Sequence, residues 1–253
     1  MLWYKSWLDT RWAFLIALAL LIVLGLGSVF GFATVQELVK SLSPADLGQG
    51  ELADTLREEI ELQSTFRGYI WSQWFAQNNT TLLIILAAVL GSGSPFSGSG
   101  RGVLFSLALP ASRERWIATR AGAALLELFV LAMVPSVAIV AVAPAAGEQF
   151  ALGEALVYGL CAFVGASVFT SIATLLSTVF DDLWRPLLLT CCAALAIAMV
   201  GYALPEDRGL FAAMTGGNYF FDGSVLWPEL LVAVVAVAGF VYAAAVSVAR
   251  RDF

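Results

Sequence analysis

Six apolar stretches, each long enough or nearly long enough to cross a bilayer, determine what this sequence can fold into. About 20 helical residues suffice to cross the hydrocarbon core. Hydrophobic residues make up 60% of the chain and charged residues 13%, with a mean hydropathy of +0.86. A water-soluble fold of this composition would expose too much apolar surface. The sequence therefore predicts an all-α polytopic membrane protein with six transmembrane helices that form a single transmembrane domain.

The predicted spans cover, in chain order, about residues 12–33, 71–91, 119–143, 152–179, 186–204 and 227–249. We expect the first to be retained, because the apolar core of a cleaved signal peptide is shorter, roughly 7–15 residues. The second is the weakest, since its clear apolar run covers only residues 82–90. This span must therefore begin near Trp71, which brings several polar side chains into it.

The charges of the loops predict the orientation, because positive loops are retained in the cytoplasm. With the N-terminus inside, nine of the 13 basic residues are cytoplasmic: Lys5, Arg11, Arg101, Arg113, Arg115, Arg120, Arg185, Arg250 and Arg251. Most of the acidic residues then lie outside, so the net charge of −6 is an external excess and gives no indication of nucleic-acid binding. We expect a bacterial inner-membrane protein with both termini in the cytoplasm.

Two external segments are too long or too apolar to be simple loops. Residues 34–70 are expected to form a helical hairpin, with Ser43 as N-cap, Pro44 at the first helical position, and an apolar stripe of Leu52, Leu56 and Ile60. Residues 205–226 are too short and interrupted to span the membrane but too apolar for a free loop. They are expected to form a re-entrant or interfacial segment.

The cytoplasmic loop of residues 92–118 begins with a glycine-serine run. Gly93 and Gly98 have the spacing of a phosphate-binding loop, but Ser99 stands where that motif requires Lys, so a flexible hinge is the better interpretation. After Pro110, Ser112 is placed to cap a short helix that leads into span three. Such a helix would lie along the cytoplasmic face.

Four polar residues fall inside predicted spans and are candidates for lining or gating a pathway: Gln77, Asn78, Asn79 and Glu127. The three amides alternatively mark the external end of a short helix. Glu127 needs a partner if it is buried, since an unpaired buried carboxylate costs several kcal/mol. Arg120 or a Ser or Thr of span four is the expected partner; alternatively, water reaches Glu127 from the cytoplasm.

Enzymatic chemistry is not expected of this chain. It contains no histidine, which excludes the common histidine-containing zinc sites and leaves no imidazole base for a nucleophile. Its three cysteines, Cys161, Cys191 and Cys192, all fall inside predicted spans, where free cysteine behaves as a small apolar residue. No catalytic residue, metal site or bound cofactor is predicted.

Three short segments resemble the permease subunit of ABC-2 type ATP-binding-cassette transporters. They are residues 1–5 together with Arg11, the loop of residues 107–113, and the C-terminal residues 249–253. In that family, an apolar stretch followed by Pro, a small residue and Ser-Arg comes after span two, and an Arg-Asp-apolar tail follows span six. Six spans in 253 residues match the family along the whole chain.

The resemblance implies an ABC-2 (type V exporter-like) permease fold. It also implies a permease that moves a substrate across the inner membrane, in the direction of export, with ATP hydrolysed elsewhere. ATP and Mg²⁺ would bind two copies of a separate cytoplasmic ATPase subunit. A second permease chain, identical or paralogous, would complete the pathway within the membrane lipid. The residues implied in coupling to the ATPase are Leu109, Pro110, Ser112, Arg113, Glu114, Arg115 and Trp116. The competing classes are an ATP-independent secondary transporter or channel, and a non-transporting membrane scaffold.

Overall fold

The computed structural model describes residues 2–41, 51–93, 113–180, 182–203 and 208–250. Of these residues 91% are helical, and none of them lies in a strand. Six helices within the described part are long and apolar enough to cross a membrane, which confirms the predicted all-α architecture and the number of spans. They cover Thr10–Glu37, Phe66–Ser92, Arg115–Ala146, Leu152–Val179, Trp184–Gly201 and Trp227–Ala249.

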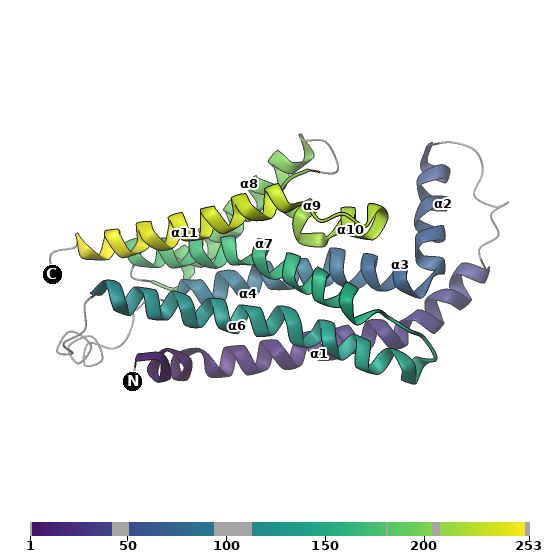
Figure 1. The fold of residues 1–253 in the computed structure, drawn as a ribbon, viewed down its shortest axis with the longest axis horizontal. Helices are drawn as coiled ribbons and strands as arrows, with labels where there is room; N and C mark the ends of the chain where they lie inside the picture. The colour runs from purple at the N-terminus through teal and green to yellow at the C-terminus, as the bar shows by residue number, and fades with distance from the viewer. Residues whose placement is uncertain (1, 42–50, 94–112, 181, 204–207, 251–253) are drawn as a thin grey trace.

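Helix α7 (Leu152–Val179) forms the centre of the bundle (Figure 1). It packs against α4 (Thr80–Ser92), α6 (Arg113–Val142), α8 (Trp184–Tyr202) and α11 (Trp227–Ala249). In its most apolar window 67% of the residues are buried, against 17% in α8 and in α11. Small residues allow this close packing. A Cβ placed on Gly91 of α4 would lie 2.5 Å from the backbone oxygen of Thr170 in α7.

The first helix, α1 (Leu2–Ser41), is unbroken and packs along α6. It begins about ten residues before the predicted span. One side of α1 is exposed over most of its length, with Trp12, Ile16 and Val23 each at least 65% exposed. Apolar side chains exposed on a helix of this length are typical of a surface that faces lipid or another membrane helix.

The second span is continuous from Phe66 to Ser92, but its upper part is not an ordinary α-helix. Helix α3 (Phe66–Ile70) passes into a π-helical stretch, η2 (Trp71–Asn79), before α4 begins. Two side chains in or next to this stretch bond to carbonyls five residues earlier. The Asn78 Nδ2 donates to the Gln73 oxygen at 2.7 Å, and the Thr80 hydroxyl donates to the Phe75 oxygen at 2.8 Å. Such bonds satisfy backbone carbonyls in the widened π geometry.

Short helices lie at the end of the bundle away from the chain termini (Figure 1). Helix α2 (Glu51–Ser64) lies across this end and contacts chiefly α3 and α1. Ser43 and Pro44, the predicted start of this external helix, fall outside the described residues. Helices α9 (Leu210–Thr215) and α10 (Gly217–Asp222) have six residues each and are joined at Gly216. A 3-10 turn, η3 (Ala143–Ala146), follows α6.

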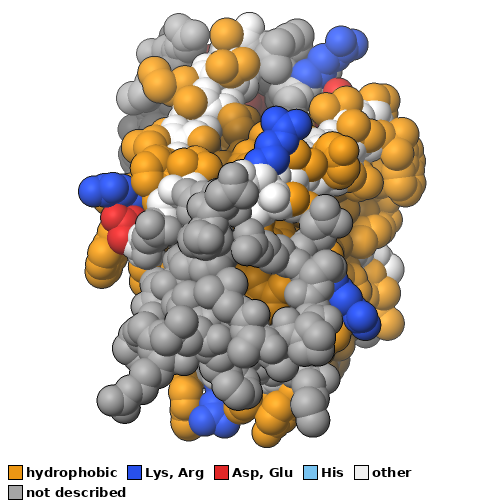
Figure 2. All heavy atoms as spheres, turned by 90° about the vertical axis from the view of Figure 1, so that its left-hand side faces the viewer, with side chains coloured by type: hydrophobic (Ala, Val, Ile, Leu, Met, Phe, Trp, Pro, Cys, Tyr) orange, Lys and Arg blue, Asp and Glu red, His pale blue; other side chains and the backbone are white. Residues whose placement is uncertain are grey.

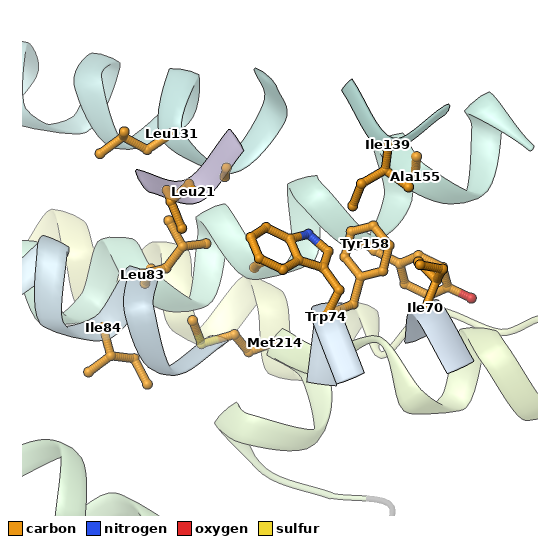
Figure 3. Close-up of a cluster of buried hydrophobic side chains, with 14 of the residues drawn as sticks. Leu21, Ile70, Trp74, Leu83, Ile84, Leu131, Ile139, Ala155, Tyr158 and Met214 are labelled. Atoms are coloured by element: carbon orange, nitrogen blue, oxygen red, sulfur yellow. The ribbon is translucent and has the colours of Figure 1, made fainter. Parts of the chain in front are cut away.

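The main hydrophobic core lies where α1, η2, α4 and α7 meet. Trp74 is fully buried there, and Figure 3 shows it among Leu21, Leu83 and Tyr158, with Met214 of α9 below it. Gly25 of α1 leaves room for the indole, since a Cβ at this position would lie 3.2 Å from the ring. The core therefore joins the first span to the second and the fourth.

Candidate functional site

The predicted coupling segment lies at the end of the bundle that carries both termini. Leu109, Pro110 and Ser112 fall outside the described residues. Helix α6 begins at Arg113 and continues without a break to Val142, so residues 113–116 are its first turn rather than a separate helix. Figure 2 looks onto this end and shows several arginine side chains on it. Arg115 is exposed and Trp116 is half-buried. The side chains of Arg113 and Glu114 are not described.

The first turns of α6 are anchored to two other helices. Ile117 of α6 forms a small buried cluster with Ala244 and Val248 of α11. Trp116 of α6 and Leu175 of α7 pack against this cluster. A displacement of residues 113–117 would therefore act directly on the ends of α11 and α7.

Arg120 connects the same part of α6 to the end of α4. A Cβ on Gly93, the C-cap residue of α4, would collide with the Arg120 guanidinium. The cation thus lies against the C-terminus of α4, where it interacts favourably with the helix dipole. A side chain at position 93 would have to displace the end of the flexible Arg120 side chain, a contact that the sequence did not reveal.

The three candidate amides of span two do not share a surface. Gln77 and Asn78 are exposed on the outside of the helix, whereas Asn79 is 0% exposed. Neither the oxygen nor the nitrogen of the Asn79 amide has a hydrogen-bond partner within the described residues. Asn79 is thus the amide that faces the interior, at the junction of the π-helical stretch with α4.

Glu127 is buried in α6 and is held by the first helix. Its Oε1 accepts a hydrogen bond of 2.5 Å from the Thr10 hydroxyl of α1. Its Oε2 is buried and has no hydrogen-bond partner in the part of the chain that the structure describes. The hydrogen-bond donor is therefore a threonine of span one rather than a hydroxyl of span four, while Arg120, the other partner that the sequence suggested, attracts the carboxylate electrostatically. The bond joins two segments 117 residues apart.

A further cluster, at the opposite end of the bundle, was not predicted. We call it the α9–α10 clamp; its members are Arg67, Trp71, Glu154 and Phe220. Arg67 donates from Nε to the Glu154 carboxylate at 2.8 Å, and its guanidinium lies 4.4 Å from the centre of the Phe220 ring. Trp71 stacks on the same ring at 4.6 Å. The clamp joins the second span and α7 to the short helices α9 and α10.

Two adjoining pockets lie next to α9. The larger lies between α8 and α9, and the smaller lies between α7, α9 and α11. The larger has a volume of about 560 Å³ and the smaller about 290 Å³. Both are lined by Gly209 and Leu210. Their walls are mainly apolar, but Arg208 lines the larger pocket and Glu229 the smaller.

Within the described residues, no group of three or more Cys, Asp or Glu side chains is arranged to hold a metal ion. No family model, no curated protein and no solved structure matches the chain. The fold alone defines the class: a helical protein with six helices, within the described residues, that are long and apolar enough to cross a membrane.

Proposed function

We propose that this chain is the permease subunit of an ABC-2 type ATP-binding-cassette transporter. Three features support the proposal: the six apolar helices, the resemblance of residues 107–113 to the family, and the basic end of the bundle. In this proposal both termini and residues 113–120 lie in or near the cytoplasm, in accordance with the positive-inside rule. A separate subunit binds and hydrolyses ATP, and a second permease chain completes the pathway.

The observation that carries the proposal is the attachment of the first turns of α6. Trp116 and Ile117 pack on the ends of α7 and α11, and Arg120 lies against the end of α4 at Gly93. A force applied by an ATPase subunit to the first turn of α6, residues 113–116, would therefore reach three other helices through direct packing. Because packed helices transmit displacement as rigid bodies, such a segment is suited to coupling.

Glu127 extends this connection to the first helix. It lies two turns beyond Arg120 on α6 and accepts the hydrogen bond from Thr10 of α1. In the proposed mechanism, tilting of α6 moves α1 through this bond. The amide of Asn79 is buried and has no hydrogen-bond partner within the described residues. In the proposed mechanism, the surroundings of this amide change when the helices of the bundle separate.

The first experiment is to purify the full chain from its native membrane and identify what accompanies it. A stoichiometric cytoplasmic ATPase is the expected partner. The coupling variants Arg113→Ala and Trp116→Ala are then expected to lower substrate-stimulated ATPase activity of the complex at least severalfold while the protein still inserts into the membrane.

Matched controls exist at the same end of the bundle. Trp184 is 68% exposed and Arg185 is paired with Asp182 on the surface. Trp184→Ala and Arg185→Ala are expected to leave the ATPase activity unchanged. Normal stimulation in both coupling variants would refute the assignment of residues 109–116. Transport by the chain alone, driven by an ion gradient, would instead favour a secondary transporter.

A further inference from the structure

The two adjoining pockets have the size and the chemistry of a lipid site. We define the headgroup pocket as the pair of cavities lined by Ile197 and Val200 of α8, Leu210 of α9, Val232 of α11, and the charged residues Arg208 and Glu229. Their volumes of about 560 and 290 Å³ lie in or near the range of small-ligand sites. Apolar walls with a few polar groups are typical of such sites.

A glycine brings the two pockets together. Gly209 adopts φ +111°, a conformation that a side chain rarely tolerates, and it lines both cavities. The chain turns here immediately before α9 begins at Leu210. Arg208, next to this glycine, lines the larger pocket, and Glu229 of α11 lines the smaller one.

Neither of the two charged side chains forms an ion pair with another described residue. Arg208 is exposed and makes no ion pair with any residue that the structure describes. Glu229 is half-buried, and its Oε2 is inaccessible to solvent and has no hydrogen-bond partner among the described residues. A buried carboxylate oxygen without a donor is costly, and a ligand that supplies N–H groups would relieve this cost.

The position of the pocket along the bundle suits a headgroup. It lies between the last turns of α8 and the first turn of α11, close to where these spans end. Trp227, the first residue of α11, is 62% exposed and adjoins Pro228 and Glu229. Tryptophan at the end of an apolar helix is typical of the membrane interface.

We propose that this site binds a phospholipid whose headgroup carries both a phosphate and a protonated primary amine, as in phosphatidylethanolamine. Arg208 binds the phosphate, and the Glu229 carboxylate accepts hydrogen bonds from the ammonium group. An acyl chain lies against Ile197, Val200 and Leu210. This inference does not depend on the proposed transport function, because it concerns binding by the chain alone.

The test uses the purified full chain in detergent, delipidated and then titrated with phosphatidylethanolamine, phosphatidylcholine or phosphatidylglycerol of identical acyl chains. Native mass spectrometry measures the retained lipid and thermal unfolding measures the stabilisation. Phosphatidylethanolamine is expected to bind at least about tenfold more tightly than the other two, the factor that corresponds to one good charged hydrogen bond. Soluble glycerophosphoethanolamine is expected not to compete, because it lacks the acyl chains.

Variants separate the two contacts. Arg208→Gln is expected to weaken binding of all three lipids about tenfold, whereas Glu229→Gln is expected to abolish the preference for the amine and leave phosphatidylcholine binding unchanged. Arg185→Gln and Asp222→Asn, which change exposed charges outside the pocket, are the matched controls. Ala198→Trp, which fills the larger pocket from α8, is expected to block all three lipids.

Three results would overturn the proposal. The first is equal retention of the three lipids by the unmodified protein. The second is stronger binding of phosphatidylglycerol, which would indicate a purely anionic preference. The third is unchanged selectivity in Glu229→Gln when the variant unfolds at the same temperature as the unmodified protein.

Discussion

Arg67 and Glu154 form an ion pair of 2.8 Å between the start of the second span and the start of the fourth. The same guanidinium donates to the backbone oxygen of Phe220 at 3.3 Å and lies over its ring. Trp71, one turn further along, stacks on that ring and donates its indole N–H to the Thr215 oxygen at 3.2 Å. One arginine and one tryptophan thus hold the short helices α9 and α10 against the bundle.

Replacement of Arg67 is expected to loosen α9 and α10 more than replacement of its acidic partner. Glu154→Gln removes a partly exposed ion pair, worth up to about 1 kcal/mol. Arg67→Gln removes this ion pair and also the hydrogen bond to the Phe220 oxygen and the cation–π contact. The total loss of stabilisation is about 1–3 kcal/mol. Hydrogen exchange of residues 208–226 measures the difference. Arg57→Gln on the exposed helix α2 is the control, and equal exchange in the Arg67 and Glu154 variants would contradict the prediction.

Gly216 is expected to be less replaceable than Gly223. It has φ +66°, and a Cβ there would lie 2.8 Å from the Tyr158 ring. Gly223 has φ +70° but open space around it. Gly223→Ala should cost only the backbone strain, about 1–2 kcal/mol, whereas Gly216→Ala should cost clearly more. Thermal unfolding in detergent compares the two, and a similar loss in both would show that Tyr158 moves aside freely.

Gly91 is expected to set the distance between α4 and α7. A Cβ at this position would lie 2.5 Å from the Thr170 oxygen and 2.6 Å from the Ala173 Cβ. Gly91→Ala must separate the helices and should lower the unfolding temperature by several degrees, in line with about 1–3 kcal/mol for overpacking. Gly239→Ala on α11 is the matched control, since nothing lies within 4 Å of its added methyl group. An unchanged unfolding temperature in Gly91→Ala would argue against this close packing.

The Thr10 hydroxyl is expected to stabilise the pairing of α1 with α6. Thr10→Val keeps the shape of the side chain but leaves the buried Glu127 carboxylate without its donor, at a cost of about 1–3 kcal/mol. Thr10→Ser retains the hydroxyl and should behave like the unmodified protein. Thermal unfolding and protease accessibility of the N-terminal residues measure the effect. If Thr10→Val had the same unfolding temperature and protease accessibility as the unmodified protein, Glu127 would have to accept a hydrogen bond from another donor.

The sequence by itself determined the architecture, because the cost of exposing backbone and charges to lipid permits only long apolar helices. The distribution of apolar residues therefore predicted six spans, and the described residues form six helices of that kind. The weak second span was also foreseen to need the aromatic segment near Trp71. Its π-helical geometry was not, since i+5 hydrogen bonding leaves no periodic signature in a mixed polar and aromatic stretch.

Only the tertiary structure decided which polar residues meet. Arg67 pairs with a residue 87 positions away, and Thr10 with one 117 positions away. Such pairs depend on how helices are arranged around α7, and hydrophobic helix surfaces do not specify neighbours. The same arrangement buries Asn79 while it leaves Gln77 and Asn78 exposed. Hydropathy determines that a helix spans, whereas close packing of small residues and a few buried hydrogen bonds determine which helices are adjacent.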